Sequence, residues 1–88
     1  MKHLNIKISG SVHGVGFRWA ALKKAGQLGL VGFVRNEQEG VYMEVEGDES
    51  AIDKFIAWCR KGPLFASVEN IEVEETKLVG YNTFEIKN

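Results

Sequence analysis

The chain has 88 residues, a net charge of −1, 44% hydrophobic and 26% charged residues. This length predicts one domain, residues 1–88, with a modest core, and the near-neutral charge argues against general nucleic-acid binding, which needs a basic surface. No apolar run reaches the about 18 residues of a membrane span, and Asn5 and Lys7 interrupt any signal-peptide core. The single cysteine, Cys59, excludes a disulfide framework, so we expect a reducing, cytoplasmic location.

The first third of the chain predicts a strand, a loop and a helix. Residues 3–9 alternate between apolar and polar side chains, which predicts a half-buried strand with His3 on its solvent-facing side. A glycine-rich loop follows. Apolar residues then recur at helical spacing over residues 17–28, and Gly29 ends this predicted helix.

A hairpin is predicted next. Residues 31–35 and 41–46 have the composition of strands, and the segment from Asn36 to Gly40 is typical of a hairpin turn. The second of these strands alternates, so it is the candidate for an exposed edge of the sheet. We nevertheless expect a monomer.

The second half of the chain predicts another helix and two strands. The helix follows the segment Gly47-Asp48-Glu49-Ser50 and ends at Gly62-Pro63. Its apolar stripe consists of Ile52, Phe55, Ile56 and Cys59. We therefore interpret Cys59 as a small buried hydrophobe and place Trp58 beside the stripe, partly packed. An acidic strand over 68–75 and a short fifth strand over 83–87 complete the pattern.

This order of elements, β-α-β-β-α-β, predicts an α+β ferredoxin-like sandwich. Such a fold has a mostly antiparallel four- to five-stranded sheet, with both helices on one face. The same fold carries many unrelated functions, so function has to be inferred from particular residues.

The loop before the first helix is the strongest candidate for a binding site. The segment from Gly10 to Arg18 places glycines and one arginine at a strand-to-helix junction, where backbone N–H groups point toward the loop and attract anions. The expected cradle consists of the N–H groups of His13, Gly14, Val15, Gly16, Phe17 and Arg18. It lacks the Lys-Ser/Thr ending of a nucleotide P-loop, so it suits one phosphoryl group without Mg²⁺. The alternative is a purely structural turn.

Charge is distributed unevenly along the chain. Residues 1–36 contain six of the 11 basic residues and none of the 12 acidic ones. An anion site built from this segment would meet no carboxylate of its own segment. Alternatively, folding interleaves the two segments and removes the asymmetry.

Arg18 and Asn36 are the two side chains most suited to chemistry. A cation in the first turn is unfavourable for the helix dipole, and a bound anion would reverse that effect; the alternative is an exposed arginine lying over Phe17 or Trp19. Asn36 would orient a water molecule without titrating, whereas turn formation explains an asparagine equally well. The residues alone leave both alternatives open.

Two segments together resemble the acylphosphatase family: Val12-His13-Gly14-Val15-Gly16-Phe17-Arg18, and Gly29 to Asn36 followed by Gly40. This resemblance implies a small enzyme that hydrolyses the carboxyl–phosphate bond of acyl phosphates. It also implies that Arg18 and the amides of residues 13–18 hold the phosphate, while Asn36 positions the attacking water. His13 stands where glutamine is most common in the family, and Phe33 where tryptophan is frequent.

The chemistry of acyl phosphates fits such a site. The leaving group is a carboxylate, which needs no general acid, and a loose transition state asks little of the nucleophile. Positioning and charge stabilisation then suffice, with no metal, cofactor or covalent intermediate. We expect an acyl phosphate and inorganic phosphate as partners, with no nucleic acid and no membrane.

Other reactive side chains have simpler interpretations. His13 is either a nucleophile or base, or an outward-facing loop residue; Glu37 either assists the water or is solvated; Ser11 has no base in its neighbourhood. Two other functions compete with hydrolysis. One is a module that binds a phosphorylated metabolite without turnover, and the other is an RNA reader, against which the acidic second half argues.

Overall fold

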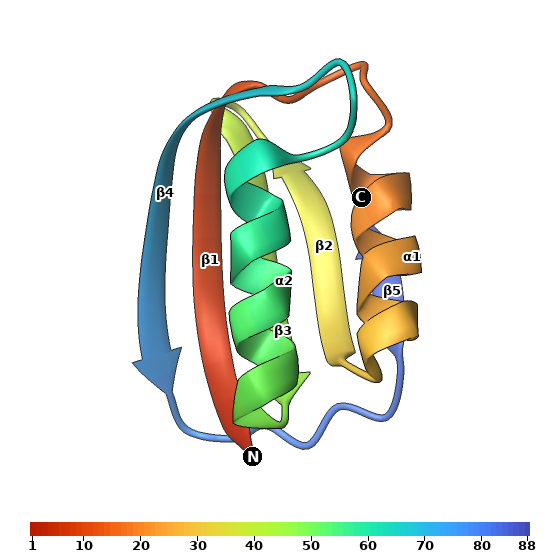
Figure 1. The fold of residues 1–88 in the computed structure, drawn as a ribbon, viewed down its shortest axis with the longest axis vertical. Helices are drawn as coiled ribbons and strands as arrows, with labels where there is room; N and C mark the ends of the chain where they lie inside the picture. Colours follow the sequence, from red (N-terminus) through yellow and green to blue (C-terminus); the bar gives the residue numbers. More distant parts are fainter.

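The computed structural model describes residues 1–88, with two helices and five strands (Figure 1). In chain order the elements are β1 (Lys2–Ser11), α1 (Phe17–Leu28), β2 (Val31–Glu37), β3 (Gly40–Gly47), α2 (Glu49–Lys61), β4 (Ser67–Thr76) and β5 (Phe84–Lys87). The predicted order of elements and the short fifth strand are therefore confirmed. Neither helix is long and apolar enough to cross a membrane.

The strands form one mixed sheet in the order β4-β1-β3-β2-β5. All neighbours are antiparallel except β5, which runs parallel to β2. The expected ferredoxin-like α+β fold is confirmed. The expectation that the third strand is an exposed edge is wrong, because β3 lies between β1 and β2 at the centre of the sheet. Its alternating pattern reflects one face covered by helices and one left open, and the true edges are β4 and β5.

Both helices lie side by side on one face of the sheet (Figure 1). The apolar residues that point to this face from the strands, together with one stripe of each helix, form the core. Its members are Leu4, Ile6, Ile8, Val12, Phe17, Ala21, Ala25, Leu30, Val34, Val41, Met43, Val45, Ile52, Phe55 and Cys59. Burial of this apolar surface supplies the main driving force for folding.

The two helices differ in the residues that end them and in the charges that lie near their ends. Gly29 ends α1 in the left-handed conformation, as predicted, with φ of 69°. Helix α2 follows Asp48, has Glu49 in its first turn and has Arg60 and Lys61 in its last turn, an arrangement that favours the helix dipole. Helix α1 has no acid in its first turn and no base in its last, so its dipole is left uncompensated.

The sheet face opposite the helices is covered at one end. His3 lies on this face but is only 1% exposed, so the expectation that it faces solvent is wrong. Tyr81, from the segment that joins β4 to β5, stacks on the His3 ring with centroids 5.9 Å apart. Alternation along β1 assigns His3 to the correct face, but this non-local segment buries it.

Candidate functional site

The end of β2 directs Asn36 toward the helices. Because side chains alternate along a strand, Asn36 shares its face with Val34, which is fully buried, whereas Asn36 lies beyond the core and is exposed. Asn36 pairs with Val41 in the β2–β3 ladder, and only residues 38 and 39 form the turn. The interpretation of Asn36 as a turn residue is therefore wrong, and its amide is not used in forming the hairpin.

Phe17 anchors the start of α1. Its ring is 2% exposed and lies 5.5 Å, centroid to centroid, from Trp58 of α2. Trp58 in turn packs on Phe55 at 5.7 Å, which confirms its partly packed position. This aromatic contact between the helices holds the first turn of α1 in place, and Arg18 is the next residue along it.

The two glycines of the loop adopt a conformation that other residues avoid. Gly14 and Gly16 have φ of 71° and 75°, in the left-handed region where a Cβ atom is unfavourable. A Cβ atom at either position would meet no other atom within 4 Å. These glycines are therefore required for backbone conformation rather than for close packing, and the space in front of the loop is open.

The backbone N–H groups of this loop lack partners within the protein. None from His13 to Trp19 donates a hydrogen bond to another residue, and the first helical bond runs from the Ala20 N–H to the Gly16 carbonyl. No side chain caps α1. His13 Nε2 donates to the Gly40 carbonyl at 2.6 Å, so this exposed side chain fastens the loop to the start of β3. The result is a fixed loop with free donors, which favours an anion.

A cavity of about 310 Å³ lies where the loop, α1, β2 and β5 meet. It is lined by Val12, Gly14, Gly16, Phe17, Arg18, Trp19, Asn36 and Ile86. Arg18 is the only charged side chain in this lining, Asn36 is the only amide, and there is no carboxylate. Arg18 and Asn36 are thus brought to one cavity, whereas His13 and Val15 do not line it.

Arg18 is not held by any carboxylate. Its Nη1 atom donates a long hydrogen bond of 3.4 Å to Oδ1 of Asn88. The cation–π contacts of the protein involve Arg35 and Lys87, and none involves Arg18. Glu37 accepts a hydrogen bond from Arg35 at 3.2 Å and does not line the cavity. The guanidinium of Arg18 is therefore available to an anionic ligand.

A second group of titratable side chains lies at the opposite end of the sheet. His3 Nδ1 is 2.7 Å from Oε2 of Glu46, and Nε2 is 2.8 Å from Oδ1 of Asn5 and 3.1 Å from Oε1 of Glu44. Ionised carboxylates only accept hydrogen bonds. Both ring nitrogens face oxygen acceptors, an arrangement that favours the imidazolium form of His3.

The pKa values of this group follow from its contacts. Burial alone would lower the pKa of His3, but the hydrogen bonds to Glu46 and Asn5 and the nearby carboxylate charges raise it above its usual value. Burial alone would raise the pKa of Glu46, but hydrogen bonds from His3 and from the backbone of Val79, Gly80 and Tyr81 lower it. The cluster therefore contains a buried His3–Glu46 ion pair at the end of the sheet opposite the cavity.

The remaining candidates are not placed for chemistry. Cys59 is fully buried, as expected, and burial raises the pKa of its thiol. Ser11 is exposed and does not line the cavity. No group of three His, Cys, Asp or Glu side chains is placed to hold a metal ion.

Three residues of the cavity lining, Val12, Trp19 and Ile86, were not predicted as site residues from the sequence. Trp19 carries a recognisable signal, since it follows Arg18 and lies off the apolar stripe of its helix. Ile86 reaches the cavity only because β5 pairs with β2, from Gly32 opposite Phe84 to Arg35 opposite Lys87. Such a parallel, non-local pairing leaves no local pattern in the sequence.

The fold and the cavity define a small α+β protein with a cationic, carboxylate-free cavity at the start of a helix. The acylphosphatase family model matches residues 4–86. An acylphosphatase of Thermotoga maritima is 46% identical over 99% of this chain and 98% of its own. The crystal structure of acylphosphatase from Bacillus subtilis superposes with a TM-score of 0.96 at 34% identity, over 100% of both chains.

The chain also resembles part of a larger protein. Full-length HypF, solved in a phosphate- and nucleotide-bound form, matches 99% of this chain with a TM-score of 0.94 and 35% identity, over 12% of its own length. These comparisons show that the chain belongs to the acylphosphatase family. The expected class of enzyme, a hydrolase that acts on acyl phosphates, is confirmed by this membership.

Proposed function

We propose that this protein hydrolyses acyl phosphates to a carboxylate and orthophosphate without a metal, a cofactor or a covalent intermediate. The observation that carries the proposal is that Arg18 and Asn36 line one carboxylate-free cavity in front of an uncapped helix. The active unit is the domain of residues 1–88.

The phosphoryl group binds between Arg18 and the loop. The guanidinium supplies a planar pair of donors, and the N–H groups from His13 to Arg18 supply further donors at the positive end of the α1 dipole. These donors stabilise the charge that spreads over the equatorial oxygens in the transition state. Because no carboxylate lines the cavity, nothing there repels the substrate or offers Mg²⁺ its preferred ligands.

Asn36 holds the attacking water in line with the bond that breaks. Its amide offers both an acceptor and donors and carries no charge, so it orients water over a wide range of pH. Water attacks phosphorus, the P–O bond to the acyl carboxylate breaks, and that oxygen leaves with the electron pair. The proton of the water passes to the phosphate product or to solvent, since a carboxylate of low basicity needs no general acid.

The test measures hydrolysis of acetyl phosphate in excess chelator by the parent protein and by Arg18→Ala and Asn36→Ala. Each variant is expected to fold and to lose at least about 10²-fold in kcat/KM, as for the removal of one oxyanion donor. Arg35→Ala and Asn70→Ala are matched controls that do not touch the cavity and should keep the parent activity.

Three outcomes contradict the proposal. The first is activity that requires an added divalent metal. The second is unchanged activity in Arg18→Ala and Asn36→Ala. The third is a rise of Tm with inorganic phosphate but no hydrolysis of acyl phosphate, which would identify a binding module instead.

We also propose a cytoplasmic monomer. The single cysteine is a free, buried thiol, which suits a reducing compartment. The β4 edge carries Glu69, Glu72, Glu74 and Glu75, and charged side chains oppose pairing between exposed strand edges.

A further inference from the structure

A second cavity adjoins the first along the outer side of α1. It has a volume of about 510 Å³ and is lined by Gly16, Trp19, Ala20, Leu22 and Lys23. Gly16 and Trp19 line both cavities. The two hollows are therefore neighbours on one continuous surface, and a ligand bound in the first can extend into the second.

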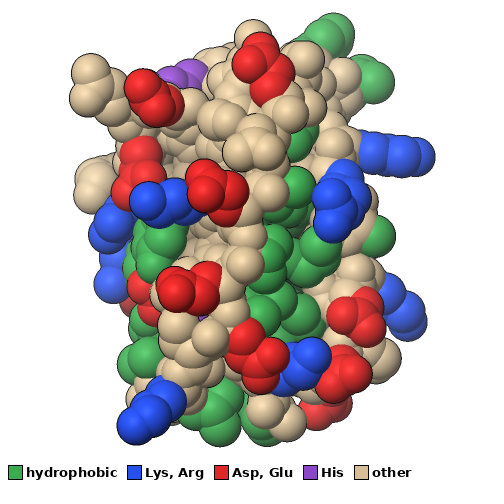
Figure 2. Space-filling view, turned by 90° about the vertical axis from the view of Figure 1, so that its left-hand side faces the viewer, with side chains coloured by type: hydrophobic (Ala, Val, Ile, Leu, Met, Phe, Trp, Pro, Cys, Tyr) green, Lys and Arg blue, Asp and Glu red, His purple; other side chains and the backbone are tan.

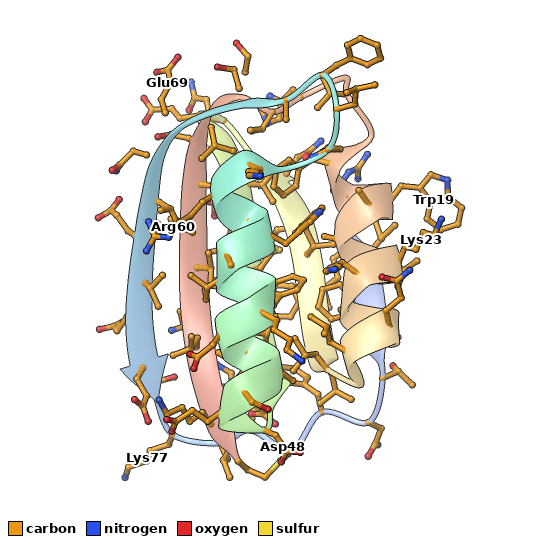
Figure 3. All side chains as sticks on the ribbon, in the orientation of Figure 1. Trp19, Lys23, Asp48, Arg60, Glu69 and Lys77 are labelled. Atoms are coloured by element: carbon orange, nitrogen blue, oxygen red, sulfur yellow. The ribbon has the colours of Figure 1, made fainter.

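Trp19 forms the boundary between the two cavities. Its side chain is 69% exposed and makes none of the ring contacts that hold the other tryptophan, Trp58. Trp19, Leu22 and Lys23 have the i, i+3, i+4 spacing of one helix face, and Figure 3 shows Trp19 and Lys23 projecting from the side of α1 that faces away from α2. Nothing in the packing of the core requires a large aromatic residue there.

The geometry of the displacement at phosphorus indicates which part of the substrate reaches this second cavity. In an in-line displacement, the attacking water and the leaving group lie on opposite sides of phosphorus. Asn36, which holds the water, lines only the first cavity, whereas Trp19 lines both. A leaving group that extends from the first cavity into the second therefore passes Trp19.

We propose that the surface formed by Trp19, Ala20, Leu22 and the stem of Lys23 binds the acyl group and selects apolar, above all aromatic, acyl phosphates. This inference rests on the proposed hydrolysis at Arg18 and Asn36. Aromatic groups stack on an indole in offset or edge-on geometry. The space is ample, since a cavity of about 150 Å³ already accommodates benzene. The ammonium group of Lys23 disfavours acyl groups that carry a positive charge.

The test compares benzoyl phosphate with acetyl phosphate as substrates of the parent protein, Trp19→Ala, Leu22→Ala and Leu78→Ala. Their leaving groups have similar basicity, so differences between them report binding of the acyl group. We expect Trp19→Ala to lower kcat/KM for benzoyl phosphate roughly 10- to 100-fold, and for acetyl phosphate by less than about threefold. Leu22→Ala should have a smaller effect of the same kind. Leu78 is an exposed apolar residue outside both cavities, so its variant should match the parent.

Inhibition by inorganic phosphate separates this role from a structural one. Phosphate has no acyl group, so Trp19→Ala should leave its inhibition constant within about twofold, because only the acyl contact is lost. An equal loss for both acyl phosphates, no loss for either, or weaker phosphate inhibition would overturn the acyl site while leaving the proposed hydrolysis intact. A parent protein that hydrolyses neither substrate would instead refute the proposed function itself.

Discussion

Arg18 occupies a position that is unfavourable for the isolated helix. A cation in the first turn opposes the positive end of the α1 dipole at a cost of about 0.3–1 kcal/mol, and no carboxylate of the protein pairs with it. The hydrogen bond that its side chain makes, to Asn88, is long at 3.4 Å. This unpaired position agrees with the proposed role of Arg18 in binding an anion.

This arrangement predicts opposite effects of Arg18→Ala with and without phosphate. Without phosphate the variant should be as stable as the parent or slightly more so, because the unfavourable charge is gone. With phosphate, the parent should gain stability by RT ln(1 + [L]/Kd), whereas the variant should gain little. Thermal unfolding across a phosphate titration measures both effects, and Arg35→Ala is the control. A variant that responds to phosphate as the parent does would contradict the assignment of Arg18.

The buried His3–Glu46 pair predicts a limited pH range of maximum stability. The pKa of His3 is raised by folding, so its contribution is fully present below the unfolded value of about 6.5 and is lost as pH rises through the folded value. The pKa of Glu46 is lowered, so its contribution is present above the unfolded value of about 4.5 and is lost as pH falls through the folded value. Together they favour folding most between about pH 4.5 and 6.5.

Removal of one partner tests this pair. Glu46→Gln should lower the free energy of unfolding by roughly 1–3 kcal/mol, because it removes the carboxylate beside Nδ1 of His3 and leaves Glu44 as the only carboxylate at the ring. It should also flatten the dependence of Tm on pH. Glu69→Gln, at an exposed position on β4, is the matched control and should change little. If Tm depends on pH in the same way in the parent and in Glu46→Gln, the His3–Glu46 pair does not contribute to stability as described.

At the scale of elements, local patterns account for most of what could be predicted. The spacing of apolar residues, together with the turn residues, correctly predicted both helices, the ends of the helices and the presence of all five strands. The hairpin turn was placed too wide, since only residues 38 and 39 form it, and non-local contacts account for the other errors. His3 is buried by Tyr81, a residue far away in the sequence. The position of β3 at the sheet centre depends on which strands pair, and alternation gives no information about that. Arg18 was proposed from the glycine loop that precedes it and Asn36 from the resemblance to acylphosphatases, and the structure places both in the lining of one cavity.

The loop before α1 can be tested through its second glycine. Gly16→Ala forces a Cβ atom onto a residue with φ of 75°, which should destabilise the protein by about 1–2 kcal/mol and lower kcat/KM by shifting the N–H donors. Gly26→Ala is the matched control, since Gly26 lies within α1 and a Cβ atom there meets nothing within 4 Å. That variant should stabilise the protein by about 0.5–1 kcal/mol. Unfolding free energies and acetyl phosphate kinetics of both variants distinguish them.

At the scale of the whole molecule, β4 is the longer of the two unpaired edges of the sheet, and it bears on the proposed monomeric state. Figure 2, which faces this side of the molecule, shows acidic and basic side chains spread around an apolar strip. Glu72 lies opposite Lys7 in the β1–β4 ladder, a favourable cross-strand pair. The ten residues of β4 expose one row of backbone donors and acceptors, so the glutamates are the main obstacle to pairing of two copies.

Replacement of these charges should therefore cause association. The double variant Glu72→Val and Glu74→Val turns the edge into a hydrophobic strand of high β-propensity and should dimerise or aggregate at micromolar concentration. The parent should sediment as a single species of 9.8 kDa. The double variant Glu72→Gln and Glu74→Gln separates the loss of charge from the gain of apolar surface, because it removes the charges without adding apolar side chains. If this control also associates, the loss of charge alone is sufficient. If the valine variant sediments as a monomer, the glutamates are not what keeps the edge unpaired, and the twist of the strand remains as the cause.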